Sequence, residues 1–227
     1  MGKTSRHGGA SDRALAQVDE PTDLVGLQNF TTEPTIGDVP LRTYVSPTAL
    51  AVVGALNRAT SPALAVAENM PRASTVLSTQ SVLTSGTLRL IHLSLVAGQV
   101  VTSLAPTSIG AAVNPTNQWF GLFDSSRVAL RFTVNDLTTA WGANTRKILA
   151  LTTPFTATYT GLYYAGILVT ADTTPSLSSA ASQSQVTGQT PILGGNTSDN
   201  ALTTVPSLPF TAGAITSSGT MPHVTAF

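Results

Sequence analysis

Apolar and polar side chains alternate along residues 73–227 with the period of two that is typical of β-strands. The clearest case is the segment 127–134. Its apolar side chains Val128, Leu130, Phe132 and Val134 fall on one face, and Arg127, Ala129, Arg131 and Thr133 fall on the other. This pattern predicts a half-buried antiparallel strand with one solvated face, which ends at the turn-forming pair Asn135-Asp136.

Other segments of the same region predict further strands. Residues 162–169 are apolar on both faces, which predicts a central strand. In residues 87–96 the alternation of apolar and polar side chains shifts by one position between Leu90 and Ile91, which predicts a β-bulge. Shorter strands are predicted at 99–104, 118–123, 147–151 and 221–227, separated by Pro, Gly and Asn turns. Together they predict an all-β fold, a jelly-roll-like antiparallel β-sandwich over 73–227 that is closed by the apolar C-terminal strand.

The first 72 residues follow a different pattern. Residues 1–45 have no sustained periodicity and many turn formers, which predicts an extended N-terminal attachment arm. Within 46–72, the pairs Ser46-Pro47 and Ser61-Pro62 are helix-start signals and predict two short helices, the second over residues 63–69. The first helix carries a narrow apolar stripe of Leu50, Val53 and Leu56. Such a stripe packs either on the chain's own β domain or on copies of itself in an oligomer.

The composition argues against most kinds of catalysis. Only 10% of the residues are charged, compared with about 25% in an ordinary soluble domain, and the formal net charge is zero. After Lys147 the charged residues are Asp172 and Asp199 alone. Enzymes need clustered titratable groups, and nucleic-acid or membrane-surface binders need a basic excess. The chain also has no cysteine, no apolar run long enough to span a membrane and no apolar region typical of a secretory signal.

The few chemically active side chains are spread along the sequence. His7, His92 and His223 have no metal-binding spacing, and we expect His92 to be a strand residue that bonds to a neighbour. Asp124 and Asp136 lie at turns, where aspartate caps the backbone. Residues 195–199 carry oxygen ligands but lack the density of a calcium loop. The sequence therefore predicts no catalytic, cofactor-binding or metal-binding residue, and no enzyme.

Two features leave more than one interpretation open. The aromatic residues are core anchors of the sandwich or, alternatively, a sugar-stacking platform. They are Trp119, Trp141, Tyr159, Tyr163 and Tyr164. The Ser/Thr/Gln/Gly-rich stretch 173–198 is predicted to be a long loop, which either binds a glycan or a neighbouring subunit or is a solvated insertion.

A set of short motifs resembles a domain of tailed actinobacteriophages. The motifs are Trp119-Phe-Gly-Leu-Phe-Asp124, Arg127-Val-Ala-Leu130, Asn135-Asp-Leu-Thr-Thr-Ala-Trp141 and residues 154–167, followed by a Ser/Thr-rich run and a final apolar strand. In that family the domain occurs in minor tail proteins, fibres and other virion structural proteins. This chain departs from the pattern at Phe123, where tyrosine is frequent. The resemblance covers residues 74–227; it implies a jelly-roll-like domain on the virion surface and carries over no catalytic residue.

We therefore predict a bacteriophage virion structural protein on the particle surface, tail-associated as a minor tail protein or fibre. The alternative is a capsid decoration protein or head fibre. A polysaccharide-degrading enzyme is a third possibility, which requires paired carboxylates about 5–10 Å apart. The expected partners are other virion proteins, bound through residues 1–45, further copies of the chain in a homo-oligomer such as a trimer, and a host cell-surface glycan. Nucleic acid and membranes are not expected as partners.

Overall fold

The computed structural model describes residues 35–36, 39–40, 65–137, 139–181 and 190–227. It divides into two compact units, residues 1–49 and 50–227. In the first unit the described residues form two short antiparallel strands, β1 (Thr35–Ile36) and β2 (Val39–Pro40). The rest of the predicted arm lies outside the described residues, as does the predicted helix with its stripe of Leu50, Val53 and Leu56.

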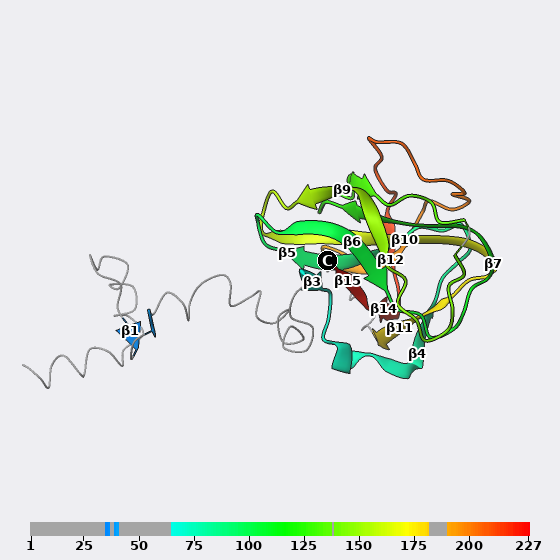
Figure 1. Ribbon diagram of the computed structural model, residues 1–227, viewed down its shortest axis with the longest axis horizontal. Helices are drawn as coiled ribbons and strands as arrows, with labels where there is room; N and C mark the ends of the chain where they lie inside the picture. The colour runs from blue at the N-terminus through cyan, green and yellow to red at the C-terminus, as the bar shows by residue number, and fades with distance from the viewer. Residues whose placement is uncertain (1–34, 37–38, 41–64, 138, 182–189) are drawn as a thin grey trace, which may run out of the picture. The chain divides into compact units, whose positions relative to one another are not determined.

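The second unit is built on a six-stranded sheet in the order β13-β12-β5-β10-β7-β8 (Figure 1). Its strands are β5 (Arg89–Leu95), β7 (Val113–Phe123), β8 (Ala129–Phe132), β10 (Gly161–Thr173), β12 (Gly194–Thr197) and β13 (Ile215–Ser217). The predicted strand 162–169 lies within β10, between β5 and β7, and its central position is confirmed.

Two smaller sheets face the same core. One has the order β3-β15-β6-β9 and the other the order β14-β11-β4. Their strands are β3 (Ala67–Glu68), β4 (Val76–Val82), β6 (Val100–Pro106), β9 (Leu149–Thr156), β11 (Ser176–Ala181), β14 (Thr220–Pro222) and β15 (Val224–Ala226). All strand pairings in the described part are antiparallel. The fold is therefore the all-β, jelly-roll-like sandwich that the sequence predicts.

Apolar side chains are buried on both faces of the six-stranded sheet. One face carries Ile91, Phe120 and Tyr163 and packs against side chains of β6, β9, β11 and β15. The other carries Leu90, Trp119 and Leu168 and is covered by side chains of residues 192–215. Because both faces of β10 are buried, residues 162–169 are apolar at consecutive positions instead of alternating.

This two-sided burial corrects the predicted bulge in residues 87–96. β5 pairs with β10 in an uninterrupted register from Arg89 to Leu95, so there is no bulge between Leu90 and Ile91. The two residues point to opposite faces, as consecutive strand residues do, and each enters a separate core. The change of parity therefore reflects a second core instead of an irregular backbone.

The predicted strand 127–134 is also corrected. β8 covers only Ala129–Phe132, Ala129 is buried, and Val134 is 65% exposed although it was expected on the buried face. The strand begins after Arg127, whose φ is 67°, and the register with β7 shifts between Leu122 and Phe123. These irregularities break the alternation that the isolated sequence suggests.

Two further predictions fail where the chain forms strands. Within the predicted loop 173–198, residues 176–181 form β11 and residues 194–197 form β12. Within the predicted helix 63–69, residues 67–68 form β3, followed by a short 3-10 helix at Arg72–Ser74. The predicted strands 99–104, 118–123 and 147–151 are confirmed as β6, β7 and β9, whereas the predicted strand 221–227 is divided into β14 and β15, which belong to different sheets. Among the described residues, no helix is long and apolar enough to cross a membrane.

Candidate functional site

Asp124 is a turn-capping residue. Its Oδ1 accepts hydrogen bonds from the backbone N–H groups of Ser126 and Val128, each at 2.8 Å. These bonds hold the turn that places Arg127 at a φ of 67°. An aspartate that accepts two local backbone bonds stabilises the turn, as the sequence predicted.

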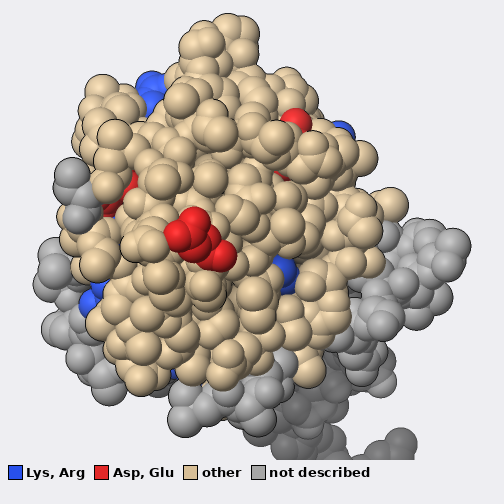
Figure 2. All heavy atoms as spheres, turned by 90° about the vertical axis from the view of Figure 1, so that its right-hand side faces the viewer, with Lys and Arg blue, Asp and Glu red and all other residues tan. Residues whose placement is uncertain are grey.

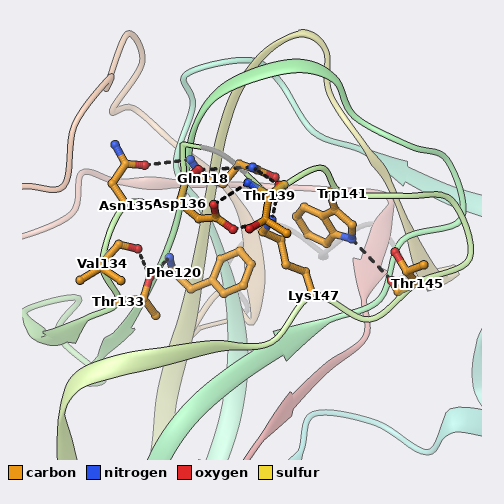
Figure 3. A network of polar contacts seen from close by, with 10 residues as sticks. All are labelled: Gln118, Phe120, Thr133, Val134, Asn135, Asp136, Thr139, Trp141, Thr145 and Lys147. Atoms are coloured by element: carbon orange, nitrogen blue, oxygen red, sulfur yellow. Dashed lines mark hydrogen bonds and ion pairs between the residues drawn. The ribbon is translucent and has the colours of Figure 1, made fainter.

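Asp136 caps a turn and also neutralises a buried cation. Its Oδ1 accepts the backbone N–H of Thr139 at 2.9 Å, and its Oδ2 lies 2.9 Å from Nζ of Lys147. Figure 3 shows this network, in which Lys147 also donates to the Thr139 carbonyl at 2.8 Å. Gln118 donates to that same carbonyl at 3.0 Å. The ammonium group therefore has a carboxylate and a carbonyl as partners, which offset part of the cost of burying it.

The other two aspartates of the sandwich also make structural contacts. Asp172 Oδ2 accepts a hydrogen bond from Nδ2 of Asn114 at 2.8 Å, and Asp199 Oδ2 accepts the backbone N–H of Gly213 at 2.6 Å. Residues 195–197, part of the calcium-like segment, belong to β12. No group of three or more His, Asp or Glu side chains that could hold a metal ion occurs in the described part of the chain.

The aromatic residues are mainly core anchors. Trp119, Trp141, Tyr163 and Tyr164 are fully buried, so they cannot form a sugar-stacking platform. Tyr159 is partly buried and stacks on Tyr163, with ring centroids 4.4 Å apart. Its hydroxyl donates to the Leu162 carbonyl at 2.8 Å. The tyrosine pair thus fixes the turn that precedes β10.

Arg89 is a buried cation whose hydrogen-bond partners are neutral oxygens. Its Nη2 donates to Ser218 Oγ at 2.8 Å and to the Thr220 carbonyl at 2.6 Å. Burial lowers the pKa of the guanidinium to about 10, so it stays protonated at neutral pH. Arg89 thereby ties the six-stranded sheet to β14.

The structure brings His92 and His223 to two consecutive residues, Glu68 and Asn69. We call these four residues the β3 clasp. They meet where β3 pairs with β15, close to the C-terminus in Figure 1. The third histidine, His7, lies outside the described residues.

The side chain of Asn69 bridges the junction between β14 and β15. Its Nδ2 donates to the Pro222 carbonyl at 2.8 Å, and its Oδ1 accepts the backbone N–H of Val224 at 2.9 Å. The backbone N–H of Asn69 also donates to the Val224 carbonyl at 3.3 Å. The side-chain amide of Asn69 therefore bonds to the backbone of the residues before and after His223, as the backbone of a neighbouring strand would.

His92 holds the same residue from β5. Its Nε2 lies 2.9 Å from the Asn69 carbonyl oxygen, which can only accept, so the neutral ring carries its proton on Nε2. Burial lowers the pKa of His92, and the nearby carbonyl groups of Asn69 and Leu193 oppose this effect. The expectation that His92 bonds to a neighbour is confirmed.

His223 lies beside an ion pair whose carboxylate is buried. Glu68 accepts a hydrogen bond from Nε of Arg72 at 2.7 Å, and its Oε2 lies 3.9 Å from Nε2 of His223. The side chains of Glu68 and His223 are 3% and 6% exposed. Burial lowers the pKa of His223; Glu68 raises it, and Arg72 and Arg146 lower it further, so the net direction is downward.

Sequence reasoning missed the β3 clasp because Glu68 and Asn69 were predicted to be helical. A strand of two residues has no periodicity to detect. The only sequence signal was the presence of His92 and His223 in predicted strands. A comparison of the chain with protein families and with curated protein sequences returns no match.

Proposed function

We propose that this chain is a structural protein of a bacteriophage virion, tail-associated as a minor tail protein or fibre. Its sandwich faces outward, and residues 1–45 attach it to other virion proteins. The motifs behind this proposal, residues 119–124 and 154–167, lie mainly in β7, β9 and β10. The motifs therefore lie mainly in strands of the sandwich, as expected if the resemblance reflects a similar fold.

The observation that carries the proposal is that β9 is an uncharged edge strand with exposed threonines. This strand lies at one end of the four-stranded sheet, is eight residues long and contains no charged residue. Its exposed side chains include Thr152, Thr153 and Thr156. Edge strands of freely soluble proteins are usually protected by charges, whereas β9 has only Pro154 and a single bridge from Leu151 to Thr133. A neutral, hydroxyl-rich edge favours packing against another chain or a glycan.

The wider surface agrees with this role. Figure 2 shows one face of the molecule on which charged side chains are few and scattered among neutral ones. Hydroxyl and amide groups form adaptable hydrogen bonds to neutral partners and are insensitive to salt. Weak contacts of this kind become effective when many copies are linked on one particle.

Cryo-electron microscopy of particles of the encoding phage tests the location. We expect density for the sandwich on the tail. Density on the capsomers would instead favour a decoration protein or head fibre, and absence of the chain from purified virions would refute the proposal. Deleting residues 1–45 should leave the sandwich folded but absent from particles.

A substitution on β9 tests the contact surface. Thr153→Lys should reduce the copies per particle at least tenfold, because it places a charge on the edge strand. Thr204→Lys, at a threonine that is also exposed but lies outside the strands, is the matched control. Equal incorporation of the two variants would exclude β9 from the contact.

Incubation with host cell-wall polysaccharide tests the remaining alternative. We expect the protein to be retained on the polysaccharide without releasing oligosaccharide. Release that disappears on mutating Asp124 or Asp136 would favour a polysaccharide-degrading enzyme.

A further inference from the structure

The two histidines of the described residues lie against consecutive positions: His92 contacts Asn69, and His223 lies beside Glu68. These positions lie at the end of β3, a strand of two residues whose one partner among the described strands is β15. We propose that the β3 clasp is an acid-sensitive joint: acidification detaches residues 66–69 from β15 while the rest of the sandwich stays folded.

Protonation of His92 acts on the joint more directly than protonation of His223. In the neutral ring Nε2 donates to the Asn69 carbonyl, and Nδ1 is buried with no hydrogen-bond partner in the described structure. Protonation places a second N–H on Nδ1, which has no hydrogen-bond partner in the closed clasp. The charged ring is then more stable in water than in its site, and leaving the site breaks the bond to Asn69.

Among the described residues, no charged side chain stabilises a protonated His92. The groups that act on it are the backbone carbonyls of Asn69 and Leu193. Tyr164 lies opposite His92 on β10, and burial raises the pKa of its hydroxyl, so Tyr164 stays neutral. The burial penalty therefore dominates, in agreement with the lowered pKa of His92.

His223 acts on the other half of the clasp. Its neighbours are Glu68 on β3, Arg72 in the 3-10 helix and Arg146 before β9. Glu68 already forms an ion pair with Arg72, so a protonated His223 adds a second cation to one carboxylate. Burial and the two arginines outweigh the attraction of Glu68, so the closed clasp disfavours protonation of His223 as well.

The direction of the pH effect follows from the two lowered pKa values. Each ring binds a proton less readily in the closed clasp than when exposed, where the pKa is about 6.5. Closure is therefore fully stabilised above about pH 6.5 and loses stability as the pH falls toward the lowered values. Opening stays local because β3 is short and terminal in its sheet, whereas β10 lies between two cores.

Hydrogen exchange of the full chain at pH 7.5 and 5.0, corrected for the intrinsic rates, tests this joint. At pH 5.0 we expect the protection of the Val66, Asn69 and Val224 amides, all hydrogen-bonded in the clasp, to fall at least tenfold. Amides of β10 should keep theirs. Retained protection at Val66 and Asn69, or an equal loss in β10, would overturn the proposal.

The double variant His92→Gln/His223→Gln removes both titrating rings while keeping amide donors. Its clasp amides should be protected equally at the two pH values; an acid loss as large as in the wild type would overturn the proposal. If the variant is open even at pH 7.5, nuclear magnetic resonance titration of the wild-type rings decides instead. Values below 6.5 for His92 and His223 support the joint, and values at or above 6.5 refute it.

Discussion

Replacing Asn69 by alanine removes two hydrogen bonds that join β3 to the β14–β15 junction. The Pro222 carbonyl loses its donor at 2.8 Å, and the Val224 N–H loses its acceptor at 2.9 Å. Both residues are buried, so water cannot readily replace the lost partners. Each unsatisfied buried group costs about 1–3 kcal/mol, which predicts a decrease of about 2–6 kcal/mol in the free energy of unfolding.

Urea denaturation, followed by the fluorescence of the buried Trp119 and Trp141, measures this decrease. The slope of the unfolding free energy against urea should stay unchanged, because the backbone bonds of Asn69 to Val224 and His92 remain. Asn200→Ala is the matched control. Its side chain is exposed and makes no hydrogen bond in the described structure, so it should change stability by less than about 0.5 kcal/mol.

The two variants together decide the argument. If Asn69→Ala is as stable as Asn200→Ala, the side-chain amide does not bridge the junction between β14 and β15. A large decrease in the free energy of unfolding of both variants would mean that the effect is not specific to Asn69. It would equally refute the role of the Asn69 side chain in the β3 clasp.

Three further substitutions test other contacts by the same denaturation assay. Gly195→Ala should destabilise the sandwich by about 1–3 kcal/mol, because the new Cβ would lie 1.8 Å from the Thr216 carbonyl oxygen, whereas Gly219→Ala, with open space around it, should be neutral. Lys147→Met should cost about 3–5 kcal/mol by leaving Asp136 without its cation, and adding Asp136→Asn should recover part of that loss. Asp124→Ala should cost about 1–3 kcal/mol through the lost backbone bonds of its turn, and an unchanged midpoint would contradict the capping role.

The strands with a long local pattern could be predicted from the sequence. Residues 162–169 are apolar on both faces, which was enough to place β10 in the centre of a sheet. The apolar C-terminal segment predicted the closing strand β15, and the turn chemistry of Asp124 predicted a cap. These features depend on neighbouring residues, and side-chain period and local hydrogen bonding are properties of short segments.

The second core and the β3 clasp were decided by the tertiary structure alone. The change of parity at Leu90 and Ile91 could be interpreted only once both faces of β5 were known to be covered. Ala67 and Glu68 form a strand, and Asn69 is held at its end, because residues 222–226, more than 150 positions later, supply their partners. The polar groups of such a short strand are satisfied by distant chain segments, and a local pattern carries no information about those pairings.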